Sequence, residues 1–335
     1  MMFDRILIPL DGSPRAERVL SHLASVLVRK DSEVLLVRSV SVYPLMLTSV
    51  DAGSYLARAK KAAEEYLQGV AKTLEERGVR VRTQLLEGYP AEAILDVARR
   101  ERSSMIAMTT HGRSGLARWL LGSVAEKILR ASPVPVLAVR SFGPTARGTS
   151  EPTAPKETVF HRILVATDGS PASRAMEEPV EELAKLFGSQ VVVLHVWDTY
   201  VPEGDPLPGM EAGMTLPTSA PSSLEDEVTA EVAGRLSRSG LQVTRVTAQG
   251  EPAAQIIEQS QAEGIDLVVL GTHGRSGLSR WMLGSVAERV LRSLAVPLLV
   301  VRAGAPTDGG NSGRAPLRGA GSSTAGSLEK RISSS

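Results

Sequence analysis

The chain has 335 residues, enough for about two domains of roughly 100–200 residues each. Its 38 basic and 37 acidic residues give a net charge of +1, so there is no electrostatic case for a nucleic-acid or membrane-surface partner. The absence of cysteine excludes disulfides, thiolate metal sites and a cysteine nucleophile. The sequence contains no signal-peptide core and no apolar run of about 20 residues, so we expect a cytoplasmic protein without a membrane span.

Residues 1–140 predict a regular alternation of strands and helices. Short apolar runs indicate strands, and longer segments with an apolar face indicate helices. The expected strands are 5–10, 33–40, 79–86, 104–108 and 134–139, and the expected helices are 14–29, 57–77, 91–100 and 124–130. Ser13 is expected to cap the first helix, with Pro14 in its first position. This alternation is typical of an α/β fold with a doubly wound parallel sheet.

Residues 161–302 repeat the same order. The expected strands are 162–167, 190–196, 241–248, 266–270 and 296–301, and the expected helices are 172–187, 224–239, one that Pro252 opens, and 286–292. Residues 141–160 are rich in Pro, Thr, Gly and Ser and are interpreted as a linker. Residues 303–335 are rich in Gly, Ser and Ala and are expected to be a disordered tail. We call residues 1–140 the first repeat and residues 161–302 the second repeat.

A glycine-rich loop joins the fourth strand of each repeat to the next helix. In the second repeat it contains Gly271, Gly274 and Arg275 and runs on to Gly284 and Ser285. Glycine allows a ligand to approach the backbone closely, and backbone N–H groups before a helix N-terminus favour a phosphate. The corresponding residues of the first repeat are Thr109, Gly112, Gly122 and Ser123.

An Asp-Gly-Ser turn follows the first strand of each repeat, at Asp11 and at Asp168. If the sheet switches direction between its first and fourth strands, the turn and the glycine loop border one crevice. Backbone donors then face a carboxylate, an arrangement that suits a nucleotide. Either aspartate could accept a hydrogen bond from a ribose hydroxyl or hold a Mg²⁺ ion that bridges the phosphates.

The spacing Gly271-x2-Gly274-x9-Gly284-Ser285 resembles the ATP-binding signature of universal stress proteins. The resemblance extends over both repeats and implies five-stranded, Rossmann-like parallel sheets of order 3-2-1-4-5, with helices on both faces. It assigns Asp168 and the backbone of Val196 to the ribose and adenine, and the four signature residues to the phosphates. Arg275 either reaches a phosphate or is solvated. In the first repeat the candidate residues are Asp11, Val40, Thr109, Gly112, Gly122 and Ser123.

Other interpretations of these residues remain open. Thr109 stands where the signature has its first glycine, so ATP binding is most secure in the second repeat. Ser123 and Ser285 each begin a Ser-x-x-Glu pattern, which is typical of a capping box. The two aspartates could be plain turn residues. His195 ends a strand and is expected to be a buried histidine whose hydrogen bonds are satisfied.

Together these patterns indicate a tandem universal stress protein that binds ATP, with Mg²⁺, as a regulatory or stress-response module. Catalysis is not expected, because there is no Walker lysine or arginine finger, although weak hydrolysis stays open. The alternatives are a slow ATPase or nucleotidyl transferase on the same fold, and a nucleotide-free scaffold. The apolar closing strands are expected to pair within the chain as an internal pseudo-dimer, and a homodimer stays open.

Overall fold

The computed structural model describes residues 2–40, 52–110, 121–140, 159–170, 173–197, 223–272 and 283–302. Several predictions fall outside these ranges, namely those for Gly112, Gly274 and Arg275, for most of the linker 141–160 and for the tail 303–335.

The first repeat forms five parallel strands in the order β3-β2-β1-β4-β5, as the resemblance implied. Its elements are β1 (Arg5–Pro9), α1 (Arg18–Lys30), β2 (Glu33–Val40), α2 (Ala52–Glu75), β3 (Arg80–Glu87), α3 (Pro90–Arg100), β4 (Met105–Thr109), α4 (Ser123–Ala131) and β5 (Val136–Val139).

The second repeat has the equivalent order, β8-β7-β6-β9-β10, also with parallel pairing. Its elements are β6 (Arg162–Ala166), the 3₁₀ helix η2 (Ser173–Met176), α5 (Glu177–Phe187), β7 (Gln190–Trp197), α6 (Ser223–Arg238), β8 (Gln242–Gln249), α7 (Pro252–Ala262), β9 (Leu267–Gly271), α8 (Ser285–Ser293) and β10 (Leu298–Val301). The predicted α/β fold class is therefore confirmed, with the strand order repeated in both halves.

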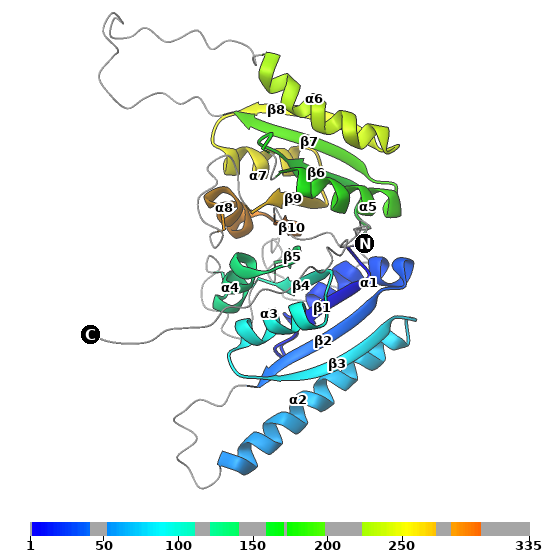
Figure 1. Ribbon diagram of the computed structural model, residues 1–335, viewed down its shortest axis with the longest axis vertical. Helices are drawn as coiled ribbons and strands as arrows, with labels where there is room; N and C mark the ends of the chain where they lie inside the picture. Colours follow the sequence, from blue (N-terminus) through cyan, green and yellow to red (C-terminus); the bar gives the residue numbers. More distant parts are fainter. Residues whose placement is uncertain are drawn as a thin grey trace, which may run out of the picture. The chain divides into compact units, whose positions relative to one another are not determined.

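The two five-stranded sheets are joined into one sheet of ten strands (Figure 1). Strands β5 and β10 pair antiparallel, with Leu299 opposite Leu137. Two arginines support this junction from either side. The guanidinium of Arg140 donates to the carbonyl of Leu294 at 3.1 Å, and that of Arg302 donates to the carbonyl of Ser132 at 3.3 Å. Each arginine therefore holds the end of a helix that belongs to the other repeat.

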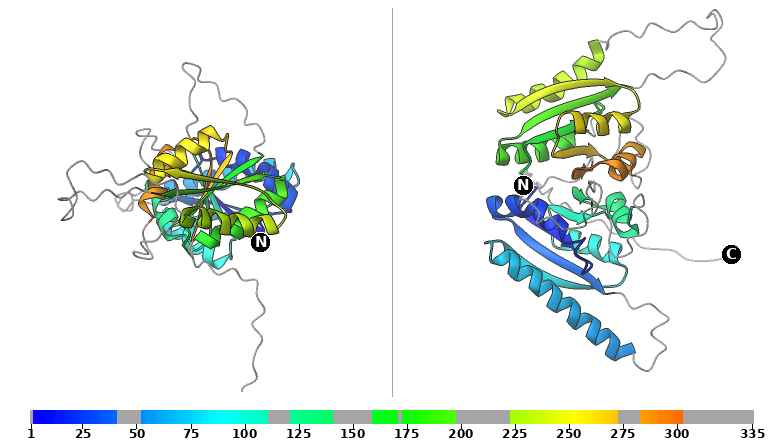
Figure 2. Two further views of the ribbon diagram at one scale, coloured as in Figure 1. Left: turned by 90° about the horizontal axis from the view of Figure 1, so that it is seen from above. Right: turned by 180° about the vertical axis from the view of Figure 1, so that it is seen from behind.

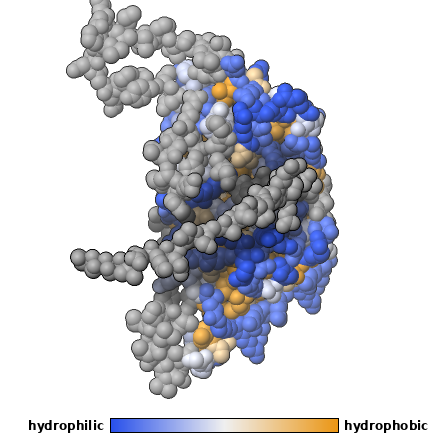
Figure 3. Space-filling model, viewed as in Figure 1, coloured by the Kyte–Doolittle hydropathy of each residue, from blue (hydrophilic) through white to orange (hydrophobic). Residues whose placement is uncertain are grey.

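Helices cover both faces of the sheet, which explains why its central strands are apolar throughout (Figures 1 and 2). One core lies beneath α1, α2, α5 and α6, and the other lies beneath α3, α4, α7 and α8. Successive residues of a strand alternate between them, so Leu36 belongs to the first core and Val37 to the second. The outer surface on the side seen in Figure 3 is mostly hydrophilic where the chain is described.

The start of the first helix differs from the prediction. Helix α1 begins at Arg18 rather than Pro14, and its N-cap residue, Glu17, makes no side-chain capping bond. The hydroxyl of Ser13 instead accepts from the N–H of Ala16 at 3.2 Å, within a preceding turn. In the second repeat η2 occupies the corresponding place before α5. The Asp-Gly-Ser turn of the first repeat is thus closed by hydrogen bonds among its own residues, and in both repeats the α-helix begins only after the turn.

Candidate functional site

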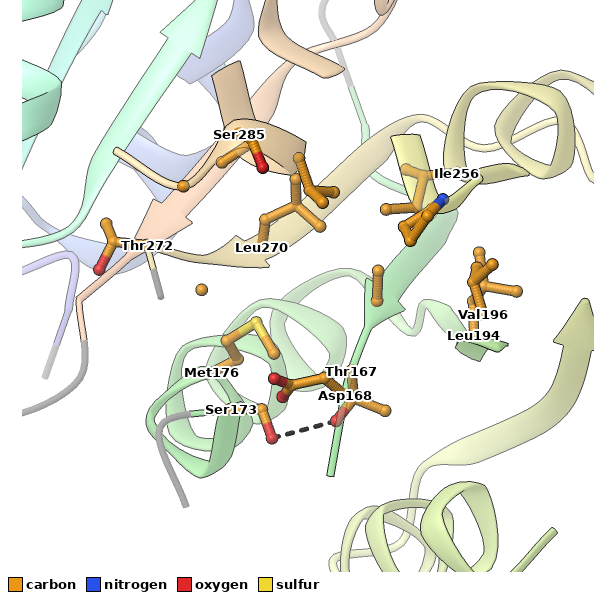
Figure 4. Close-up of a pocket in the computed structure, with 16 residues that line it drawn as sticks. Thr167, Asp168, Ser173, Met176, Leu194, Val196, Ile256, Leu270, Thr272 and Ser285 are labelled. Atoms are coloured by element: carbon orange, nitrogen blue, oxygen red, sulfur yellow. Dashed lines mark hydrogen bonds between the residues drawn. The ribbon is translucent and has the colours of Figure 1, made fainter. Parts of the chain in front are cut away.

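A cavity of about 290 Å³ lies in the second repeat, at the carboxyl ends of β6, β7 and β9 (Figure 4). Its walls come from these three strands, from the turn after β6, from η2 and from the beginnings of α7 and α8. They consist of Ala166, Thr167, Asp168, Ser173, Met176, Leu194, Val196, Pro252, Ile256, Leu270, Gly271, Thr272, Gly284, Ser285, Val286 and Ala287.

The sheet topology places the cavity at this position. Strands β6 and β9 are neighbours, but the helices that follow them pack on opposite faces of the sheet, α5 on one core and α8 on the other. Such a switch point opens a crevice at the carboxyl ends of the strands. The predicted site residues Asp168, Val196, Gly271, Gly284 and Ser285 all line this crevice.

Asp168 is held by the turn in which it lies. Its Oδ1 atom accepts from the N–H of Ser170 at 3.0 Å, and the same contact occurs at 2.9 Å between Asp11 and Ser13. Gly169 has φ +75°, a conformation that favours glycine. In each repeat, one carboxylate oxygen of the aspartate therefore stabilises the turn by accepting this hydrogen bond. In the second repeat the turn lies at the wall of the cavity.

Helix α8 begins in a way that overturns the capping-box interpretation. The N-cap residue is Gly284, with φ −59° and ψ 146°, and Ser285 is the first helical residue. In the first repeat Gly122 is likewise the N-cap and Ser123 the first helical residue. Neither helix has a side-chain capping bond, because the N-cap position falls on a glycine. The Ser285 side chain instead belongs to the cavity wall, as Figure 4 shows.

Gly284 is needed for close packing. Its N–H donates to the carbonyl of Thr272 at 3.0 Å, and a Cβ at Gly284 would lie 3.1 Å from that oxygen. The backbone donors that helix geometry leaves without an intrahelical partner belong to the next three residues, Ser285, Val286 and Ala287, which all line the cavity. Val286 and Ala287 were not predicted as site residues, although their place in the first turn after the glycine loop could have identified them.

The opposite part of the cavity is apolar. Leu194 and Val196 come from β7, Ile256 from α7, Leu270 from β9 and Met176 from η2 (Figure 4). Only Val196 among these residues was predicted from the sequence. The others lie in elements far apart in the sequence, and only the tertiary fold brings them together.

The strand register aligns the two repeats residue by residue. Arg5 pairs with Glu33 in the first repeat, and Arg162 pairs with Gln190 in the second. Counting from these pairs, the counterpart of Val196 is Ser39, and the predicted residue Val40 corresponds to Trp197. Thr109 corresponds to Gly271 and is buried at the end of β4.

The repeats also differ at the preceding aligned position, which is His195 in the second repeat and Arg38 in the first. His195 is buried, with Nδ1 2.8 Å from the carbonyl oxygen of Thr167, which confirms the expected satisfied histidine. Its counterpart, Arg38, lies over the ring of Tyr66 at 5.0 Å. The hydroxyl of Tyr66 donates to Glu17 at 2.9 Å. Burial raises the pKa of Tyr66, and the bond to Glu17 raises it further.

Comparison with known proteins identifies the family. The universal stress protein family matches residues 2–140 and 160–302, so the chain belongs to this family. A universal stress protein of Mycolicibacterium smegmatis is 28% identical over 313 residues, which cover 89% of this chain and 96% of that protein. One of Methanocaldococcus jannaschii is 35% identical over 141 residues, covering 42% of this chain and 83% of that protein.

Solved structures agree on the fold. The crystal structure of a universal stress protein from Archaeoglobus fulgidus matches with a TM-score of 0.69 at 23% identity, covering 91% of this chain and all of that one (100%). A universal stress protein structure from Pseudomonas aeruginosa matches with a TM-score of 0.60 at 18% identity, covering 90% of this chain and 93% of that one.

Among the described residues, no helix is both long and apolar enough to span a membrane.

Proposed function

We propose that the second repeat binds ATP and that the protein acts as an ATP-binding regulatory or stress-response module. One observation carries this proposal. The cavity has an apolar part between β7 and α7, and its other part is lined by the first residues of α8. Because the first part suits a base and the second suits phosphates, the cavity matches the two ends of a nucleotide.

The described residues fit such a ligand. Asp168 and the backbone of Val196 would hold the ribose and adenine, and the N–H groups of Ser285 to Ala287 would hold the phosphates. Gly271 would allow a phosphate to approach the end of β9. We also propose Gly274 and Arg275 as phosphate ligands, although they lie outside the described residues.

Magnesium would accompany the phosphates. Among the described residues, no group of three or more His, Asp or Glu side chains could hold a metal ion. A Mg²⁺ ion would therefore be held chiefly by the nucleotide and water, with Asp168 as the one carboxylate among the described residues that line the cavity. Asp11 would have this role in the first repeat.

ATP binding is a weaker proposal for the first repeat. Asp11, Gly122 and Ser123 keep the positions of their counterparts, but Thr109 adds a branched side chain at the end of β4. We propose that the first crevice binds ATP less tightly than the second, or not at all.

We propose that the protein is not an enzyme, because its sequence contains no Walker lysine and places no base for an attacking water. A slow ATPase or nucleotidyl transferase is the competing proposal, and a nucleotide-free scaffold is the third. Phosphate release from the ATP-loaded protein distinguishes the first two proposals.

We also propose that the protein is located in the cytoplasm, where ATP is available. The two repeats would form an internal pseudo-dimer through β5 and β10, and association of two such chains into a homodimer is a further proposal.

The proposal is tested by counting nucleotides. The purified chain is incubated with ATP and Mg²⁺, separated from free ligand and denatured, and the released nucleotide is quantified. We expect about one equivalent per chain. The variant Asp168→Ala should release much less, whereas the matched variant Asp11→Ala should release nearly as much as the wild type. No nucleotide from the loaded wild type would overturn the ATP proposal and favour the scaffold.

A further inference from the structure

Glu251 places a carboxylate at the N-terminus of α7, next to the cavity. Its Oε1 atom accepts from the N–H of Ala253 at 3.1 Å, and its Oε2 atom accepts from the N–H of Ala254 at 2.8 Å. Pro252, the residue between Glu251 and these donors, lines the cavity. The protein's own carboxylate therefore occupies the anion-binding position of this helix.

The same carboxylate holds an arginine of α8. Nη1 of Arg289 lies 3.2 Å from Oε1 of Glu251. Arg289 follows Ser285 by one helical turn and so lies on the same face of α8. Since Ser285 and Pro252 both line the cavity, the ion pair spans the two helices at its rim. Both side chains are substantially exposed, so the pair itself adds little stability.

The first repeat lacks this arrangement. The residue before α3 is Tyr89, which makes no side-chain capping bond and is 74% exposed. The counterpart of Arg289, one turn after Ser123, is Lys127. This carboxylate is therefore a feature of the second repeat, and α3 forms with the same length as α7 without it.

Among the described residues, the N-termini of α7 and α8 and the side chain of Arg289 could attract phosphates at this cavity. Glu251 already uses the donors of α7 and pairs with Arg289, whereas α8 begins at a glycine and has no side-chain cap. A polyphosphate that turned toward α7 would meet a negative charge in place of free donors. The phosphates are therefore directed to the start of α8, and the apolar part of the ligand lies between β7 and α7.

We propose that Glu251 is a specificity-determining residue of the nucleotide site. It fixes the orientation of the phosphate chain and sets how strongly affinity depends on the number of phosphates. The inference rests on the proposed function, because it requires that the cavity binds a nucleotide.

The variant Glu251→Gln tests it, because the amide oxygen can still accept from the first turn of α7 while the charge is lost. Isothermal titration of the full chain with adenosine, AMP, ADP and ATP gives four affinities per variant. Removing the charge and releasing Arg289 should leave adenosine unchanged and strengthen ATP binding roughly three- to tenfold, with AMP and ADP between them. The gain should shrink at 1 M salt, where the Debye length falls to about 3 Å.

Two further variants complete the design. Arg289→Gln should weaken ATP binding, since Glu251 then faces the phosphates without its partner, and the double variant should differ from the sum of the single changes. The matched first-repeat variant Tyr89→Gln should show no phosphate-dependent gain. Thermal unfolding checks that each variant is folded.

The outcomes separate the two proposals. Wild-type binding of ATP together with an equal response of adenosine and ATP to Glu251→Gln, or with no response, would overturn the role of Glu251 and leave the ATP site standing. If neither the wild type nor Glu251→Gln binds any of the four ligands, the ATP proposal fails and the role of Glu251 fails with it.

Discussion

The two repeats have the same framework but different crevices. Both repeats have the same strand order, strand register and Asp-Gly-Ser turn. In both, a glycine is the N-cap residue of the helix before the fifth strand, α4 or α8. The side chains around the crevice differ at several aligned positions, with Leu10 for Thr167, Arg38 for His195, Tyr89 for Glu251 and Thr109 for Gly271. The shared features are those that backbone geometry requires, so the fold tolerates divergence at the residues around the crevice.

This comparison indicates where a change should affect binding and where it should affect stability. Gly122 and Gly284, which are the same in both repeats, are required by the path of the backbone. Gly122 donates to the carbonyl of Thr110 at 2.9 Å, as Gly284 does to Thr272 at 3.0 Å. Residues that differ between the repeats are the better candidates for setting which crevice binds a ligand.

Exchange of the first loop glycine should have the largest effect. Gly271 ends β9, and Thr109 ends β4 at the aligned position, so a threonine is compatible with the end of this strand. Gly271→Thr should therefore leave the protein folded and reduce ATP affinity at least tenfold, or about 1.4 kcal/mol, because the branched side chain obstructs the phosphates. Equilibrium dialysis with labelled ATP measures the change.

The reciprocal variant Thr109→Gly is the control for this exchange. It should keep the nucleotide of the second repeat and raise the total above the wild-type value if Thr109 is the main obstruction in the first crevice. Full ATP binding by Gly271→Thr would contradict the role given to this glycine, since both repeats would then tolerate threonine.

The arginines of the junction should have a smaller effect, and on stability alone. Arg140→Ala removes the bond to Leu294 at 3.1 Å, and Arg302→Ala removes the bond to Ser132 at 3.3 Å. Each change frees carbonyls at the end of a helix of the other repeat, and each should lower the free energy of unfolding by roughly 1–2 kcal/mol. Urea denaturation followed by circular dichroism measures it.

The nearly matched geometry of the two arginines makes their comparison informative. Because they act at opposite ends of the same β5–β10 junction, their effects should be similar, and the lysine variants should retain part of the stability. A loss confined to one arginine would show that the two sides of the junction are not equivalent in energy.

Much of the framework could be predicted because it depends on local patterns. Apolar runs marked the strands, and the turn at Asp168 and the glycines at Gly271 and Gly284 marked the carboxyl edge of the sheet. The N-cap was placed one residue too late in both repeats, because Ser-x-x-Glu also fits a helix whose cap is the preceding glycine. A sequence pattern cannot distinguish these two arrangements without the backbone angles.

The rest of the site depends on long-range packing. Ile256 and Met176 reach the cavity only because α7 and η2 lie on either side of the switch point. The ion pair between Glu251 and Arg289 joins residues whose side chains meet only when α7 and α8 pack together. The assignment of Val40 shows the same limit, since the strand register, rather than the local sequence, makes Ser39 the counterpart of Val196.

The smallest expected effect concerns Tyr66, which ties α2 to the turn before α1 in the first repeat only. Counted back from the aligned strands β3 and β8, its position in the second repeat is taken by Val228, whose side chain has no hydroxyl to donate. Tyr66→Phe should lower the free energy of unfolding by roughly 0.5–1.5 kcal/mol and leave ATP binding unchanged.

The contribution of Tyr66 to the free energy of unfolding should depend on pH, because its pKa is raised in the folded state. Burial and Glu17 raise the pKa of Tyr66 above the ordinary value of 10.0, so the folded state keeps the phenol protonated where the unfolded chain ionises. The stability that Tyr66 contributes is therefore fully present below about pH 10 and is lost as the pH rises further. In denaturation at pH 8, 9, 10 and 11, the difference between wild type and Tyr66→Phe should shrink only at the upper end. A difference that stays constant across this range would contradict the hydrogen bond between Tyr66 and Glu17. It would show that packing alone holds α2 against the turn before α1.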